Sequence, residues 1–187
     1  FAYCKKISGL SDKPMVSIDM GEIPKEEEKF YLVTSEDEKA GAEMSEYLIS
    51  NGTKKIIYLA NAVHGADYRR YQGAKKTADR KSCELEMKLL PTETEGRQMV
   101  YGELLKYAGT DTTLLFSTDK NAAEMISFLH RNDVKVPEDI SVAGIDDDVF
   151  ATIVYPTITT MKIDVEEKAN MAVEILMRLI QGESCMP

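Results

Sequence analysis

Short apolar runs alternate with longer amphipathic stretches over most of this chain. The apolar runs predict strands at residues 14–19, 30–34, 55–60, 82–90, 113–117, 140–145 and 157–163. The stretches between and after them predict helices at residues 35–52, 66–80, 96–108, from 119 onward and at 164–182. Crossovers of this length join parallel strands. We therefore expect an α/β protein with a parallel sheet and helices on both faces.

The strand expected at residues 140–145 ends in three consecutive aspartates, residues 146–148. Its residues are mostly apolar with little polar alternation, which is typical of a strand covered on both faces. Gly144 indicates that the backbone approaches another group closely. Arg70 lies near the start of the helix that follows an earlier strand. Open α/β sheets bind ligands at the carboxyl edge of their strands, and the aspartates and Arg70 are expected at that edge.

Three helix starts carry capping signals. Ser35 and Glu38 form a capping box, in which each side chain accepts a hydrogen bond from a backbone N–H of the first turn. Asp119 is expected as the N-cap of its helix, a role that needs no ligand. Asp164 with Glu167 is expected to start the last helix. These caps predict where the helices begin.

The chain is acidic, with a formal net charge of −9. An acidic surface repels phosphate groups, so the chain itself is not expected to grip DNA. Its three cysteines are widely spaced and odd in number, which predicts reduced thiols and no disulfide framework or zinc site. The sequence shows neither an apolar run of membrane-spanning length nor a signal peptide. A cytoplasmic protein with no membrane partner is therefore expected.

Common catalytic and cofactor signatures are not found in the sequence. It has no Gly-x-Ser-x-Gly, no Gly-x-x-x-x-Gly-Lys-Ser/Thr, no Gly-x-Gly-x-x-Gly and no His-Glu-x-x-His. Neither enzyme activity nor a cofactor is therefore expected. Residues 146–148 could bind a divalent metal ion, but successive side chains of an extended segment point in different directions, which favours a structural turn with one functional aspartate. His64 follows a strand and stays open as a ligand contact.

One long motif carries a family resemblance. Residues 136–147 read V-P-E-D-I-S-V-A-G-I-D-D and are followed by P-T-I-T-T at residues 156–160. This ordered combination resembles the effector-binding core of LacI/GalR-type transcriptional regulators, and the resemblance covers roughly residues 14–182. It implies a periplasmic-binding-protein-like I fold of two subdomains, one largely complete and the other partial.

The resemblance also implies how the chain divides. Residues 1–34 would belong to a partial N-terminal subdomain and residues 35–156 would form the C-terminal effector-binding subdomain. Residues 157–187 would form a hinge crossover and a helix that returns to the N-terminal subdomain. In the family, further strands and helices and a DNA-binding helix-turn-helix precede the matched part. The chain is therefore expected to be a fragment or a truncated form.

The resemblance places several side chains at an effector site. Asp146 matches the family's effector contact, and a carboxylate accepts two hydroxyl hydrogen bonds at once, which suits a sugar or polyol. Arg70 matches the arginine of the family's Arg-x-x-Gly pattern, here R-Y-Q-G, whereas Arg69 is expected to face solvent. Three further residues stand at matching positions: Thr118, Asp37 and Asp19.

Other features of the sequence bear on the effector less directly. The aromatic face of a sugar site could come from Tyr68, Phe150 or Tyr155, although each could equally serve core or hinge packing. Thr53 and Glu38 stand where histidine and asparagine are usual in the family. The loop N-A-V-H-G-A-D-Y at residues 61–68 is also unusual, which leaves the identity of the effector open.

These observations predict the effector-sensing and dimerisation domain of a LacI-type bacterial transcriptional regulator. A sugar-like small molecule would bind between the subdomains and control DNA binding by the N-terminal domain. The expected partners are this effector, a second copy of the chain, and DNA through the missing domain only. Three alternatives stay open: a sugar-binding protein for transport or chemoreception, an open α/β enzyme, and a regulator whose effector is a protein.

Overall fold

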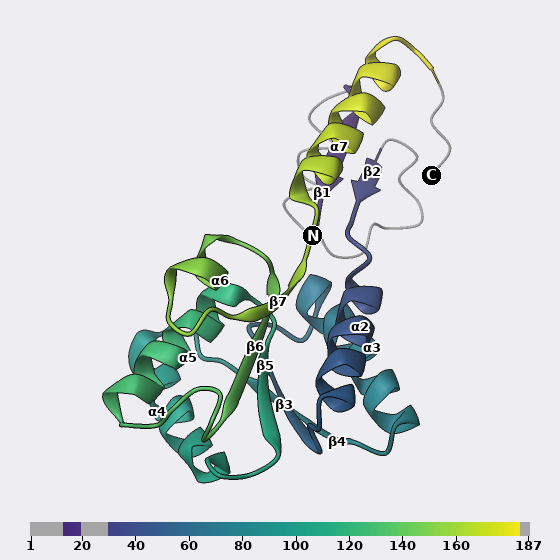
Figure 1. Ribbon diagram of the computed structural model, residues 1–187. Coiled ribbons are helices and arrows are strands. Elements are labelled where there is room, and N and C mark those ends of the chain that lie inside the picture. The colour runs from purple at the N-terminus through teal and green to yellow at the C-terminus, as the bar shows by residue number, and fades with distance from the viewer. Residues whose placement is uncertain (1–12, 20–29, 184–187) are drawn as a thin grey trace. The chain divides into compact units, whose positions relative to one another are not determined.

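The computed structural model describes residues 13–19 and 30–183 (Figure 1). The chain divides into two compact units. The larger comprises residues 37–163, and the smaller joins residues 1–36 to residues 164–187. Among the described residues, none of the helices is long and apolar enough to cross a membrane.

The larger unit is built on a five-stranded parallel sheet. Its strands are β3 (Lys55–Ala60), β4 (Glu84–Leu89), β5 (Thr112–Phe116), β6 (Ser141–Asp146) and β7 (Thr159–Lys162). They lie in the order β4-β3-β5-β6-β7. The expectation of a parallel sheet is therefore confirmed. The family-based boundary at residue 156 assigned β7 to the returning segment, but its backbone pairs with β6.

The helices of this unit are α2 (Asp37–Ser50), α3 (Gly65–Arg80), α4 (Thr94–Leu104), α5 (Asp119–Arg131) and α6 (Val149–Ile153). A 3₁₀ turn, η1 (Leu105–Tyr107), extends α4. The helix α6 stands where the sequence predicted only a loop. Five residues are too few to show a helical period, and α6 begins because the Asp148 carboxylate accepts a hydrogen bond from the Phe150 N–H, 2.8 Å away.

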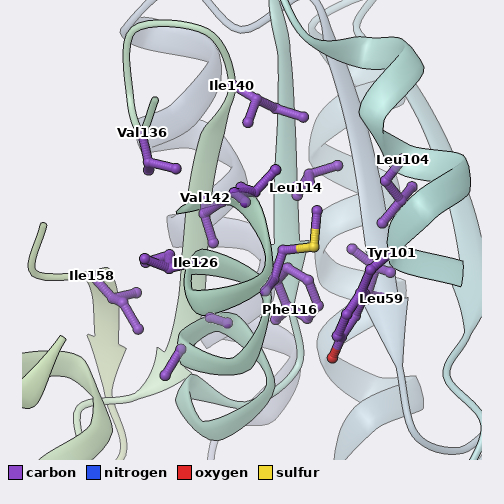
Figure 2. Packing of buried hydrophobic residues seen from close by; sticks show 14 of the residues in the cluster. Leu59, Tyr101, Leu104, Leu114, Phe116, Ile126, Val136, Ile140, Val142 and Ile158 are labelled. Atoms are coloured by element: carbon purple, nitrogen blue, oxygen red, sulfur yellow. The ribbon is translucent and has the colours of Figure 1, made fainter. Parts of the chain in front are cut away.

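One apolar layer lies between the sheet and the helices α4, α5 and α6 (Figure 2). Successive side chains of a strand point to opposite faces, so alternate strand residues such as Leu114, Phe116 and Val142 enter this layer. Tyr101 of α4 and Ile126 of α5 pack against them. The intervening strand residues pack against α2 and α3 on the other face: Ile56, Tyr58, Ala60, Leu115 and Ile145. The prediction of helices on both faces is therefore confirmed.

The helices α2 and α3 cross at unusually close range. A Cβ atom at Gly41 would lie 1.9 Å from the carbonyl oxygen of Arg70, and one at Gly73 would lie 1.7 Å from that of Glu38. No side chain fits at either position, so the crossing requires glycine on both helices. It brings Asp37, the first residue of α2, against Arg70 of α3.

The smaller unit contains a parallel pair of strands, β1 (Met15–Ile18) and β2 (Phe30–Val33), and the helix α7 (Val165–Ile180). The helix packs against both strands. As predicted, Asp164 is its N-cap and accepts a hydrogen bond from the Glu167 N–H, 2.9 Å away. Within this unit the Asp19 carboxylate accepts a hydrogen bond from the ammonium group of Lys168.

Two capping predictions were wrong. The helix α2 begins at Asp37, so Ser35 lies too early to be its N-cap, and the Ser35 hydroxyl has no hydrogen-bond partner among the described residues. Asp119 is the first residue of α5 and Thr118 is the N-cap, without a side-chain cap bond. In both cases the aspartate that follows the N-cap makes a tertiary contact instead. Cys83 is a buried free thiol, as expected, and Cys4 and Cys185 lie outside the described residues.

Candidate functional site

The carboxyl ends of β3, β5 and β6 meet at one edge of the sheet, and Asp146 ends β6 there. Asp146 and Asp147 both have positive φ angles, 146° and 56°. Such angles are uncommon outside glycine, although aspartate tolerates the left-handed region better than most residues. The turn is held to β7 by two hydrogen bonds, from the Ile163 N–H to the Asp146 carbonyl at 3.2 Å and from the Asp147 N–H to the Thr160 hydroxyl at 3.2 Å.

A buried ion cluster joins Asp146 to α2 and α3. Arg70, whose side chain is 7% exposed, donates to Asp146 Oδ1 at 3.0 Å and to Asp37 Oδ1 at 3.0 Å. It also donates to the carbonyl oxygen of Ser117 at 2.6 Å. Arg69 donates to Asp37 Oδ2 at 2.7 Å, so it does not simply face solvent as the sequence suggested. The structure thus brings three of the predicted site residues together.

The environment of Asp146 changes its acidity. Burial disfavours the carboxylate form and raises the pKa of Asp146 to about 6, although the charge and hydrogen bond of Arg70 act in the opposite direction. The negative charges of Asp119 and Asp148 add to the rise. Asp146 therefore changes charge in a range where most carboxyl groups are already ionised.

Asp119 holds the turn after β6 in place. It is fully buried, and it accepts hydrogen bonds from the Thr160 hydroxyl at 2.6 Å and from the Asp148 N–H at 3.1 Å. Burial raises the pKa of Asp119, and these two hydrogen bonds oppose the rise. A Cβ atom at Gly144 would lie 2.1 Å from Asp119 Oδ1, which explains the close approach that the sequence indicated. Asp119 therefore holds the turn after β6 against β7 through these hydrogen bonds, and it is not the N-cap of α5.

A pocket of about 460 Å³ opens at this edge of the sheet. Two predicted ligand residues, Thr118 and Asp146, line it. An apolar part of its wall is formed by Leu90, Pro91 and Phe150. The remaining lining side chains are polar or charged: Asn61, Thr92, Arg97, Lys120, Asn121 and Asp148. The pocket thus combines hydrogen-bonding groups with an apolar surface, as small-molecule sites do.

Sequence reasoning missed Asn61 and Asn121. Asn61 directly follows β3, and Asn121 lies in the first turn of α5. Both positions belong to the carboxyl edge of the sheet, so their place in the strand–helix alternation was the signal that could have identified them. Asn61 opens the unusual loop at residues 61–68 but was not named as a ligand contact, and Asn121 belongs to no recognisable motif.

The other predicted site residues lie elsewhere. Arg70 and Asp37 are behind Asp146 and are not among the residues that line the pocket. Tyr68 stacks on Tyr71, with ring centroids 5.9 Å apart, and does not line the pocket either. Asp19 belongs to the smaller unit, where it pairs with Lys168. These residues stay predictions as ligand contacts.

A metal ion has no evident place in the part of the chain that the structure describes. No group of three or more His, Cys, Asp or Glu side chains is arranged there to bind one. The side chains of Asp146 and Asp148 instead contact Arg70 and the Phe150 N–H. His64 is an exposed residue at the N-cap of α3 and makes no side-chain cap bond.

Residues 45–185 match the model of the periplasmic binding protein-like domain family. Two curated relatives are regulators. The HTH-type transcriptional regulator RegA of Clostridium saccharobutylicum is 27% identical over 79% of this chain and 46% of its own length. The HTH-type transcriptional repressor PurR of Vibrio vulnificus is 27% identical over 92% of this chain and 52% of its own length. The chain therefore spans about half the length of these relatives.

Solved structures show the same fold. A periplasmic binding protein/LacI transcriptional regulator from Alkaliphilus metalliredigens, complexed with D-xylulofuranose, superimposes with a TM-score of 0.80 at 20% identity. The match covers 94% of this chain and 65% of that protein. The periplasmic-binding-protein-like architecture expected from the resemblance is thus confirmed. The chain belongs to the periplasmic binding protein-like domain family, and these two curated relatives are HTH-type transcriptional regulators.

Proposed function

We propose that this chain is the effector-sensing part of a LacI-type transcriptional regulator and that its effector is a sugar or a sugar-like molecule. The observation that carries the proposal is the pocket at the carboxyl edge of the sheet, where Asp146 lies at the wall and is held by the buried Arg70. Effector binding would control DNA binding by an N-terminal domain, and two copies of the chain would form the dimer. A cytoplasmic location and the lack of enzyme activity belong to the same proposal.

The pocket suits a hydroxyl-rich ligand. Arg70 occupies Asp146 Oδ1, and the other carboxylate oxygen has lone pairs for ligand hydroxyl groups. Phe150 offers an apolar surface to the C–H face of a sugar ring. The relative from Alkaliphilus metalliredigens binds D-xylulofuranose, which supports a sugar as the ligand class. The net charge of −9 supports a role for this chain in sensing and not in gripping DNA.

Sensing requires more than binding. An effector shifts an equilibrium between two states of the regulator only by its difference in affinity for them. Asp146 is suited to such a role because the turn that carries it is hydrogen-bonded to β7, the strand that precedes the segment from Asp164 onward. We infer that effector contacts at Asp146 act on this connection.

A binding protein for transport or chemoreception is the second candidate. The relative complexed with D-xylulofuranose is described as a periplasmic binding protein/LacI transcriptional regulator, and its fold serves either role. Both candidates bind a sugar in the same pocket. They differ in whether the complete protein carries a DNA-binding domain, which sequencing the gene on both sides of this segment decides.

The site assignment is tested by calorimetric titration of neutral pentoses, hexoses and disaccharides. The Asp146→Asn variant should bind the preferred sugar about 1–3 kcal/mol more weakly, since it loses a charged hydrogen-bond acceptor. Asp111→Asn is the matched control, because Asp111 pairs with Lys54 at the opposite edge of the sheet and both side chains are exposed. Equal affinities of the wild type and Asp146→Asn for the sugar would refute the role of Asp146.

A further inference from the structure

We propose that Asn121, held in place by Asn61, determines which sugar this pocket accepts by hydrogen bonding to a hydroxyl group of a neutral, hydroxyl-rich effector. This inference rests on the proposed function and deepens it. It adds a second recognition point to the pocket, on α5, in addition to the carboxylate of Asp146 on β6. Asn61 opens the unusual loop at residues 61–68, and Asn121 belongs to no motif that the sequence identified.

The two asparagines form an ordered chain of side chains. Asn121 Nδ2 donates to Asn61 Oδ1 at 2.7 Å, and Asn61 Nδ2 donates to the Ser117 hydroxyl at 3.3 Å. The carbonyl oxygen of Ser117 accepts from Arg70, which in turn binds Asp146. These hydrogen bonds run along the carboxyl ends of β3, β5 and β6, and they link the position of the Asn121 amide to that of Asp146.

The Asn121 amide is buried but not fully satisfied. The residue is 7% exposed and lines the pocket. Its Nδ2 group uses one of two N–H donors on Asn61, and no residue in the described ranges donates to its Oδ1 atom. The Nδ2 group faces Asn61, so Asn121 keeps its second N–H and its Oδ1 atom as a donor and an acceptor for a ligand. A group with these properties in a pocket wall discriminates between ligands, because a mismatched ligand leaves it unpaired.

The chemistry of the pocket wall favours a neutral hydroxyl-bearing ligand. A hydroxyl group both donates and accepts, as the amide does. Asp146 and Asp148 add two carboxyl groups that accept hydrogen bonds and repel anions. The guanidinium group of Arg97 is already paired with Glu124 at 2.9 Å and so adds little attraction for an anion.

Lys120 is the competing feature. It lines the pocket, is exposed, and forms no ion pair with any residue between 30 and 183. Its ammonium group could bind the phosphate or carboxylate of a charged sugar. We favour the neutral class because a flexible exposed lysine is less defined in position than the buried amide of Asn121. The experiment distinguishes the two classes directly.

The test uses sets of isomeric sugars that include pairs of epimers, which differ only in the direction of one hydroxyl group. The 187-residue chain is titrated with the four D-aldopentoses, with D-glucose, D-galactose, D-mannose and D-allose, and with the 5- or 6-phosphates of these sugars. The variants are Asn121→Ala and Asn121→Leu, the second of which keeps the volume. Asn132→Ala is the matched control, because Asn132 lies exposed at the other end of α5.

The expected result is a loss of discrimination. In both Asn121 variants the affinity ratio between the preferred sugar and one of its epimers should fall roughly 3- to 10-fold, the effect of one neutral hydrogen bond. Asn132→Ala should leave every ratio unchanged. A purely structural role of Asn121 would instead weaken all sugars alike, and that outcome, or unaltered ratios, overturns the inference while the proposed function stands.

Two other outcomes also decide the matter. Tighter binding of a sugar phosphate than of the neutral sugar, abolished in Lys120→Met, would overturn the neutral class. If the wild type binds none of these sugars or phosphates, the proposed sugar effector itself fails and the role of Asn121 fails with it.

Discussion

Two buried aspartates at the same edge of the sheet have opposite kinds of partner. Asp37 is 1% exposed, and its carboxylate accepts hydrogen bonds from two arginines of α3. Asp119 is 0% exposed, and its carboxylate accepts from the Thr160 hydroxyl and the Asp148 N–H, which are both neutral. Asp37 therefore neutralises the positive charge of the two arginines, whereas Asp119 accepts hydrogen bonds from uncharged donors.

The charged partners of Asp37 and the neutral partners of Asp119 indicate which of the two positions requires a negative charge. At Asp37 a negative charge faces the buried guanidinium of Arg70, and each ion makes the burial of the other tolerable. At Asp119 burial raises the pKa, so these surroundings favour a negative charge less than water does. Replacement by the neutral and isosteric asparagine therefore separates the two roles.

The largest effect is expected for Asp37→Asn. It replaces the carboxylate that faces Arg69 and Arg70 by a neutral amide, and Asp146 is then the remaining carboxylate that Arg70 contacts. Breaking a buried pair on one side typically costs about 3–5 kcal/mol of unfolding free energy. Urea denaturation at pH 7, with the linear dependence on urea, measures the change.

Asp111→Asn is the matched control for this substitution. It removes the exposed ion pair with Lys54, whose side chains are 59% and 80% accessible, and should cost less than about 1 kcal/mol. If Asp37→Asn costs no more than Asp111→Asn, the cluster around Arg70 does not depend on charge, and the contrast between the two buried aspartates is lost.

The sheet was predictable because its signals are local. Apolar runs at residues 55–60 and 113–117 need only their own composition to be read as buried strands. The same holds for the last helix, which begins at Val165, directly after its predicted N-cap Asp164. The five residues of α6 are too short for a period, and the sequence showed only a loop there.

The partners of the site residues were less predictable because they come from distant parts of the chain. Asp146 and Arg70 could be placed at one edge of the sheet by topology. Asp37 joins them because α2 and α3 cross closely at Gly41 and Gly73. No local sequence pattern predicts this crossing. The role of Asp119 was misjudged for the same reason, since its partner Thr160 is 41 residues away.

An intermediate effect is expected at Asp119. Asp119→Ala leaves the half-buried Thr160 hydroxyl and Asp148 N–H without this acceptor, at a cost of about 1–3 kcal/mol of unfolding free energy. Asp119→Asn should cost less than Asp119→Ala, because the amide oxygen can accept from Asp148 while the amide nitrogen donates to Thr160. Urea denaturation of both variants provides the comparison. Asparagine as damaging as alanine would mean that Asp119 needs its charge, as Asp37 does.

The smallest effect concerns the pH dependence of stability. The pKa of Asp146 rises from 3.8 to about 6 on folding. The folded state therefore binds this proton more tightly than the unfolded state, and the resulting stability is present below pH 3.8 and lost as the pH rises through 6. The Asp146→Asn variant cannot titrate at this position. The unfolding free energy of the wild type minus that of Asp146→Asn should therefore fall between pH 4 and pH 7.5, by about 1–2 kcal/mol for a partly exposed group.

Urea denaturation without effector, at half-unit steps of pH, gives this difference. Thr152→Ala is the control, because Thr152 is exposed on α6 and does not titrate, so its difference from the wild type should stay constant. A difference that rises with pH would mean that the ion pair with Arg70 outweighs burial at Asp146. Asp146 would then resemble Asp37 and not Asp119, and a sugar hydroxyl would meet an ionised carboxylate at every pH in this range.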